Sequence, residues 1–231
     1  MVAQLDRSNS SYAEIQNATQ RVKRKAKTSL TKQQQKEAAA VLGQAFDGYP
    51  FMAYVLPDAK TRVQQLTKLF FPLIRSSFRH GSVTITPDGG GVLAWVPGKV
   101  FSRREKFLDL FRSGMLWVPV FLGPSVFNRF TVHDEVCEEA FLRHAQLQDP
   151  DQDFAYIWAV GVRPDQAGKG LGSTMIRAAL DEMRQQGYST CWLRTETSKN
   201  VGLYEHLGFQ QVHTETPAGS RQQYWLMSQA L

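Results

Sequence analysis

A glycine-rich segment between two regular sequence patterns constrains the fold of this chain most. It reads QAGKGLG over residues 166–172, after a β-rich run that ends at Val162 and before an amphipathic pattern over residues 173–186. Glycines at alternate positions let the backbone approach a ligand closely, and the first N–H groups of a helix have no partner within that helix. The segment therefore predicts a strand–loop–helix unit that binds an anion, such as the phosphate of a cofactor.

The glycine positions separate the kinds of loop that bind phosphate. A Walker A loop needs glycine at position 163 and a hydroxyl side chain at position 170, but the chain has Arg163 and Gly170 there. The dinucleotide fingerprint fits better through Gly168, Gly170 and Ser173, with Glu196 at a tolerable distance downstream. Against it, no βαβ repeat precedes the loop. A third interpretation is that the glycine segment only turns the chain and binds no ligand.

Two longer motifs appear in a fixed order around this loop. Residues 162–172 read VRPDQAGKGLG, and residues 200–209 read NVGLYEHLGF. The first resembles the acetyl-CoA motif of the GNAT superfamily of N-acetyltransferases, whose core is Q/R-x-x-G-x-G/A after a strand. The second resembles that family's N-x-x-L-Y-E-x-L-G-F signature. The chain is thus similar to the GNAT superfamily.

Further segments are similar to the puromycin N-acetyltransferase-like branch of that family. They are residues 45–50, 92–97 and 156–162. The resemblance covers about residues 37–231 and is sharp only after Phe154. It implies an α/β, GNAT-like fold, in which helices flank a mixed central sheet of about six or seven strands that splay apart at the cofactor site.

Periodicity and turn residues predict where the elements lie. We expect helices near residues 31–46, 59–79, 102–113, 129–148, 173–186 and 200–207, the first of them capped by Ser29 or Thr31. We expect strands near residues 82–86, 91–96, 154–162, 191–195, 209–213 and 223–227. The order is that of a mixed α/β protein.

The resemblance implies a site for acetyl-CoA, residue by residue. The pantetheine arm would lie along the strand before the loop, and the diphosphate would lie over the loop. The implied cofactor-binding residues are Val160, Gly161, Val162, Ala167, Gly168, Lys169, Gly170, Leu171, Gly172, Ser173, Asn200 and Tyr204. Two positions depart from the pattern: Ala167 stands at the Q/R position, with Gln166 one residue early, and Arg194 stands where relatives often have an acid.

The transfer of an acyl group to an amine needs a base and an acid. A lysine-like amine costs about 4.6 kcal/mol to be neutral at pH 7, so a proton acceptor is expected. Glu196 or Asp153, near the ends of the central strands, could serve. Tyr204 occupies the family's general-acid position and would protonate the departing thiolate, or would only hydrogen-bond the cofactor. Asn200 would contact the cofactor or the backbone, or cap its helix.

Length and charge indicate one catalytic domain. A chain of 231 residues with 42% hydrophobic content can bury one sizeable core. We expect a flexible segment over residues 1–18 and a single domain over residues 19–231, with a helical substrate-side insert at about residues 101–149. The net charge of +6 lies in residues 1–36, which hold eight Lys and Arg against two acids, so nucleic acid is not an expected partner. The basic run over residues 21–27 is interpreted as an anion-binding arm or as an edge strand.

Other sequence features argue against a metal site, a secretion signal and a membrane span. Cys137 and Cys191 have no metal-ligand spacing and predict a reduced, buried pair, so no metal is expected. No apolar signal opens the chain, and the longest uncharged stretch, residues 113–128, contains two prolines and is too short to span a bilayer. We therefore expect a cytoplasmic monomer or homodimer without a membrane partner.

The predicted function is acetyl transfer from acetyl-CoA to the amine of a small molecule by direct attack on the thioester. The predicted catalytic residues are Tyr204 and Glu196. Residues 115–130 of the insert are apolar enough to wall a pocket for a hydrophobic amine, or they are ordinary core. His133, Asp134 and Glu135 are interpreted as polar neighbours that do not make a site. A protein N-terminus or lysine as acceptor, or a non-catalytic acyl-CoA-binding regulatory module, stay open alternatives.

Overall fold

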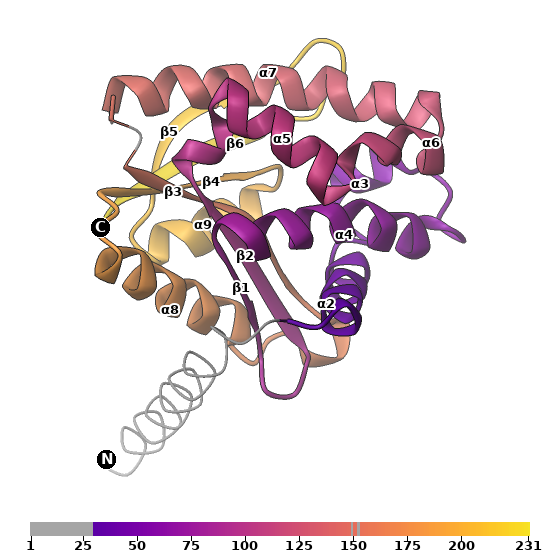
Figure 1. Cartoon of the computed structure of the whole chain (residues 1–231), viewed down its shortest axis with the longest axis horizontal. Coiled ribbons are helices and arrows are strands. Elements are labelled where there is room, and N and C mark those ends of the chain that lie inside the picture. The colour runs from indigo at the N-terminus through magenta and orange to yellow at the C-terminus, as the bar shows by residue number, and fades with distance from the viewer. Residues whose placement is uncertain (1–29, 149, 152) are drawn as a thin grey trace.

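The computed structural model describes residues 30–148, 150–151 and 153–231 (Figure 1). The predictions for residues 1–18 and for the basic run 21–27 lie outside the described residues. So does Ser29, and the first described helix is capped by Thr31 instead. The Thr31 hydroxyl accepts from the backbone of Gln34, and the Gln34 side chain accepts from the backbone of Thr31. This capping box explains why the helix begins at Lys32.

The described chain forms one mixed sheet of six strands, which confirms the predicted sheet. The strands are β1 (Ser82–Ile85), β2 (Gly91–Pro97), β3 (Phe154–Val162), β4 (Thr190–Thr195), β5 (Gln210–Glu215) and β6 (Tyr224–Ala230). Their spatial order is β1-β2-β3-β4-β6-β5. Only β3 and β4 run parallel, and every other neighbouring pair in this order is antiparallel.

Helices cover both faces of the sheet. They are α2 (Lys32–Ala45), α3 (Pro50–Val55), α4 (Arg62–His80), α5 (Arg103–Ser113), α6 (Val118–Leu122), α7 (Pro124–Gln148), α8 (Leu171–Gln185) and α9 (Ser198–His206). Buried side chains of α2, α4 and α7 share one face of the sheet, and those of α8 and α9 share the other. Figure 1 shows α7 and α8 on opposite sides of the strands.

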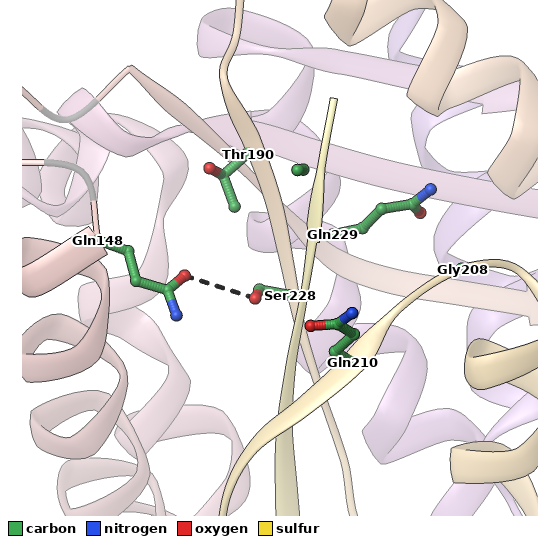
Figure 2. Close-up of a pocket in the computed structure, with 7 residues that line it drawn as sticks. Gln148, Thr190, Gly208, Gln210, Ser228 and Gln229 are labelled. Atoms are coloured by element: carbon green, nitrogen blue, oxygen red, sulfur yellow. Dashed lines mark hydrogen bonds between the residues drawn. The ribbon is translucent and has the colours of Figure 1, made fainter.

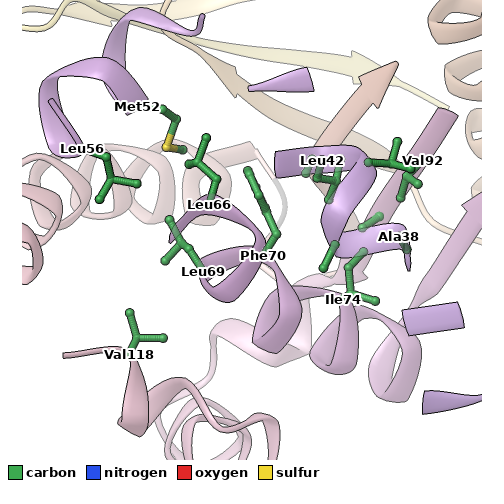
Figure 3. Close-up of a cluster of buried hydrophobic side chains, with 14 of the residues drawn as sticks. Ala38, Leu42, Met52, Leu56, Leu66, Leu69, Phe70, Ile74, Val92 and Val118 are labelled. Carbon is green, nitrogen blue, oxygen red and sulfur yellow. The ribbon is translucent and has the colours of Figure 1, made fainter. Parts of the chain in front are cut away.

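The short helices α3 and α6 were not predicted. Each is only five or six residues long and has proline at its first or second position, so neither shows a full helical period. Both nevertheless contribute buried side chains to the core beside α2 and α4. Figure 3 shows this cluster, with Met52 of α3 and Val118 of α6 on either side of α4.

A bulge in β3 divides that strand into two halves. Trp95 of β2 pairs with Ile157, whereas its neighbour Ala94 pairs with Ala159, so Trp158 is the extra residue. An extra residue reverses which side chains face which side. Ile157 packs against α8 before the bulge, and Val160 does so after it.

The bulge lies where β3 and β4 separate. Their pairing ends at Ile157 and Leu193, although β3 continues to Val162 and β4 to Thr195. Within the described chain, the second half of β3 therefore pairs only with β2. Its other backbone edge is free at the carboxyl end of the parallel pair, as a splayed sheet requires.

Helices fill the connection between β2 and β3. Val118 and Leu122 are buried there, so the interpretation as ordinary core holds for them. Seven other large apolar side chains of this region are exposed: Phe111, Leu116, Trp117, Val120, Phe121, Phe127 and Val132. Cys137 and Cys191 are both buried, and neither forms a disulfide, as predicted. No helix in the described ranges has the length and apolarity needed to cross a membrane.

Candidate functional site

The glycine loop leaves open space in front of the first turn of α8. Gly168 and Gly170 have φ angles of +78° and +74°, which favour glycine. A Cβ atom added to either would meet nothing within 4 Å. The first described backbone bond into this helix is from the Thr174 N–H to the Gly170 carbonyl, at 3.0 Å. Among the described residues, none accepts from the N–H groups of residues 168–173, which are thus available to an anion.

Side chains at this loop bond one another rather than fill it. Lys169 donates from Nζ to Oε1 of Gln166 at 2.6 Å, and Gln166 donates in turn to Asp165. All three side chains are on the surface. The departure at Ala167 leaves only a methyl group there, so the loop offers an anion its backbone N–H groups and one nearby ammonium.

The other predicted residues of the strand end have mixed roles. Gly161 faces α2, where a Cβ would approach Ala45 and Leu42 to 2.8 and 2.9 Å. Its lack of a side chain is therefore explained by helix packing. Val160 and Val162 face α8 and are partly buried. Their backbone atoms, rather than their side chains, lie on the free edge of β3.

Glu196 follows the last residue of β4, and its side chain is only 7% exposed. Its Oε2 accepts from the Tyr49 hydroxyl at 2.9 Å, and its Oε1 lies 2.7 Å from Nε of Arg194. Nε2 of His133 lies 3.7 Å from the same Oε1. Donors from three separate segments therefore surround this carboxylate.

Arg194 connects this carboxylate to the long helix of the insert. Its Nη1 donates to Oδ1 of Asp134 at 3.0 Å. Burial raises the pKa of Glu196, but the Arg194 guanidinium, with the His133 and Tyr49 contacts, outweighs it and holds that pKa below its ordinary value. Glu196 is thus ionised at neutral pH. The positive charge of Arg194 compensates the negative charge of this buried carboxylate.

Tyr204 and Asn200 both come from α9. Tyr204 is 6% exposed and packs edge-on against Phe209. Burial, and then the charge of Glu196, raise the pKa of its phenol, so it keeps its proton at neutral pH. Asn200 donates to the Thr195 hydroxyl at 3.3 Å, and that hydroxyl also contacts the Tyr49 hydroxyl at 3.0 Å. Asn200 does not cap its helix, because α9 begins at Ser198.

Asp153 does not join this group. It directly precedes β3, where its carbonyl accepts from the backbone of Ser189. Because β3 and β4 are parallel, Asp153 and Glu196 lie at opposite ends of the pair. The sequence pattern placed both at strand ends but could not tell which ends meet.

Four residues of this cluster were missed or discounted from sequence. His133 and Asp134 were interpreted as making no site, yet they reach Glu196 and Arg194 across the sheet face. Tyr49 lies in the segment 45–50 that resembled a known branch, and this was the only signal for it. Ser220, which contacts His133, gave no signal at all.

A separate cavity of about 350 Å³ lies at the other end of β4. Its lining is Gln148, Thr190, Gly208, Gln210, Ser228, Gln229 and Ala230, and Figure 2 shows these mostly polar side chains around the strand ends. Thr190 begins β4, whereas Glu196 follows its end, so this cavity is distinct from the loop and the carboxylate cluster. Within the described ranges, no group of His, Cys, Asp and Glu side chains could hold a metal ion.

Part of this chain matches a family of known proteins. Residues 128–209 match the acetyltransferase (GNAT) family. This range begins in α7 and runs through β3, the glycine loop, α8, β4 and α9. It therefore includes every element that carries the loop and the Glu196 cluster except the segment of Tyr49 and the turn of Ser220.

Individual relatives match shorter segments. Mycothiol acetyltransferase of Beutenbergia cavernae is 32% identical over 115 residues, which are 49% of this chain and 34% of that protein. The [ribosomal protein bS18]-alanine N-acetyltransferase of Escherichia coli is 34% identical over 61 residues, 26% of this chain and 41% of that protein. The crystal structure of nourseothricin acetyltransferase covers 64% of this chain and 62% of its own, with 16% identity and a TM-score of 0.36. The chain spans about a third of the length of the mycothiol acetyltransferases that it matches.

Proposed function

We propose that this chain, whose residues 128–209 match the acetyltransferase (GNAT) family, is an acetyl-CoA-dependent N-acetyltransferase that acts on the amine of a small molecule. One observation carries the proposal. The open glycine loop and the free edge of β3 lie at the same end of the β3–β4 pair as the buried carboxylate of Glu196. A loop that could bind an anion and a carboxylate that could accept a proton thus lie at the same end of this strand pair.

The residues present fit coenzyme A. The backbone N–H groups of residues 168–173 would hold its diphosphate, with Lys169 beside them. Backbone groups of residues 160–162 would bond the amides of its pantetheine arm. Asn200 and Tyr204 lie on α9, on the β4 side of the gap. When bound, acetyl-CoA supplies an activated acyl thioester for attack by an amine.

Two side chains of this protein would carry out the proton transfers of that reaction. The ionised Glu196 would accept a proton from the acceptor amine, which must be neutral to attack. Tyr204, whose raised pKa keeps its phenol protonated, would donate a proton to the departing thiolate. The exposed apolar side chains at 111–132 support a hydrophobic small molecule as the acceptor.

One alternative acceptor has a specific observation behind it. The relative from Escherichia coli is named for an alanine of ribosomal protein bS18, so a protein N-terminus is the second candidate. A cofactor-binding module without turnover is the third reading, raised by Ala167 and Arg194. The cytoplasmic location and the monomeric or homodimeric state stay predictions.

A thiol-release assay with acetyl-CoA over a panel of amines and N-terminal peptides tests the proposal. Tyr204→Phe should lower kcat about 100-fold, because it removes the proton donor, while coenzyme A binding by calorimetry persists. Tyr188→Phe is the matched control, since Tyr188 precedes β4 at the end away from Glu196 and contacts Trp95. Tight cofactor binding without turnover on any acceptor would instead favour the binding module.

A further inference from the structure

A hydroxyl, an imidazole and a carboxylate form a buried chain beside the proposed site. Oγ of Ser220 lies 2.8 Å from Nδ1 of His133, and Nε2 of the same ring lies 3.7 Å from Oε1 of Glu196. Ser220 is 3% exposed and His133 is 0% exposed. The three residues come from the β5–β6 turn, α7 and the end of β4, so only the folded chain brings them together.

The neighbours of the imidazole ring fix which nitrogen carries the hydrogen. Ser220 already accepts from the backbone N–H of Gln222 at 3.3 Å, which leaves its hydroxyl hydrogen free to donate to Nδ1. On the other side, a carboxylate attracts an N–H and repels a nitrogen lone pair. Both contacts favour a hydrogen on Nε2, aimed at Glu196.

Nε2 is buried and has no hydrogen-bond partner among the described residues. A buried donor without a partner is costly, so this arrangement needs an explanation. The 3.7 Å separation is too long for a hydrogen bond, but it leaves the N–H dipole pointing at a charged group. The favourable field of the carboxylate offsets part of that cost.

The turn that contains Ser220 has an unusual backbone conformation. Arg221 has a φ angle of +55°, and it is the one non-glycine residue with positive φ in the described ranges. Its N–H donates to the Pro217 carbonyl at 2.8 Å, which closes the turn. A residue other than glycine rarely adopts this backbone conformation without support, and Ser220, the residue before it, is buried.

Ser220 is too buried to attack a substrate, so the chain of contacts does not indicate a serine nucleophile. We propose that His133 and Ser220 are positioning residues, which hold the carboxylate of Glu196 ionised and oriented toward the acceptor amine. This inference rests on the proposed function. Ser220 fixes the tautomer of His133, and the Nε2–H of His133 then supports the charged form of Glu196.

Other groups around the His133 ring limit what Nε2 can contact. Phe51 packs against one side of the ring, with centroids 4.2 Å apart, and Tyr224 meets it edge-on at 5.9 Å. The charged and titratable groups nearby are Arg194 from β4, Glu196 just after it, Asp134 and Cys137 from α7, and Tyr49 before α3. Of these, only Glu196 lies in front of Nε2 within ion-pair distance.

Two amide variants separate the two ring nitrogens. His133→Gln can place an N–H where Nε2 lies, and so keeps the donor toward Glu196. His133→Asn can place one near Nδ1, and so keeps only the contact with Ser220. In an acetylation assay, we expect kcat of the Asn variant to be about tenfold below that of the Gln variant, because only the Gln variant keeps an N–H directed at the charged carboxylate.

The pH profile distinguishes positioning from mere packing. Because a donor to the charged form lowers a carboxyl pKa, the acidic limb of kcat/KM should move to higher pH in His133→Asn but stay near wild type in His133→Gln. Equal activity and an unchanged acidic limb in both variants would overturn the inference.

A spectroscopic readout on the cofactor-free chain is independent of turnover. The ¹⁵N chemical shifts of the ring should report the Nε2–H tautomer in the wild type and a mixture of tautomers in Ser220→Ala. A wild-type ring in the Nδ1–H form would refute the inference even if acetylation is found. If no acceptor is acetylated, the proposed function fails and this measurement still decides the arrangement.

Discussion

At the scale of single residues, Arg194 departs from the family motif but forms ion pairs with two carboxylates of the site. The resemblance to the GNAT superfamily marked its position as one where relatives often have an acid. In the folded chain its side chain is 18% exposed and lies between Glu196 and Asp134. Replacing one member of such a pair leaves the other charges buried and uncompensated.

Arg194→Met should therefore lower the free energy of unfolding by about 3–5 kcal/mol at pH 7, measured by urea denaturation. The sign with pH follows from Glu196, whose folded pKa is lowered. Its stabilisation is present above the ordinary carboxyl pKa of about 4.3 and is lost as pH falls through the folded value. The difference between wild type and variant should thus narrow below about pH 4.

Arg184→Ala is the matched control for this prediction. Arg184 forms an exposed ion pair with Asp181 on α8, at 2.9 Å, and such pairs contribute about 0–1 kcal/mol. A loss as small in Arg194→Met as in this control would mean that the buried cluster does not depend on its cation.

At the scale of elements, two glycines of the sequence motifs differ in whether their backbone conformation requires glycine. Gly170 precedes α8 with a φ angle of +74°, so its backbone conformation requires glycine. Gly202 lies inside α9, has no positive φ, and a Cβ there would meet nothing within 4 Å. The backbone conformation therefore favours glycine only at the first of these positions.

Gly202→Ala should raise the free energy of unfolding by about 0.5–1 kcal/mol, because alanine loses less backbone entropy in a helix. Gly170→Ala should lower it by about 1–2 kcal/mol, because an L side chain is strained at that φ. Chemical denaturation of the two variants in parallel measures both. Stabilisation by both substitutions would show that the loop does not keep its left-handed backbone.

At the scale of the whole molecule, the sheet has a core on each face, and the insert adds an exposed apolar surface. Ile176 of α8 is fully buried against the sheet. Trp117 of the insert is 61% exposed. Two large apolar residues of one chain thus differ in what they contribute to its stability.

Ile176→Ala should cost about 2–5 kcal/mol, through lost burial and the cavity left behind. Trp117→Ser should change stability by no more than about 0.5 kcal/mol, since Trp117 is already mostly exposed to water. Thermal unfolding of the two variants compares them directly. A large loss for Trp117→Ser would mean that another surface covers the insert in solution.

The sequence by itself determined the regular elements and the order of the motifs. Alternation predicted β3 as residues 154–162, as found, and helical period predicted α8 and α9 to within two residues of each start. It also predicted the open glycine corner before α8. These features depend on neighbours a few positions apart, so periodicity and local backbone preference suffice to reveal them.

Only the tertiary structure decided which side chains meet at Glu196. Tyr49 and His133 reach it from segments 147 and 63 positions away, and Ser220, 24 positions away, contacts His133. Asp153 is excluded because it lies at the other end of the parallel pair β3–β4. The bulge at Trp158 was equally invisible, since the extra residue is defined only by its pairing with β2. Such contacts depend on how helices pack across a sheet, and no local pattern in the chain encodes that geometry.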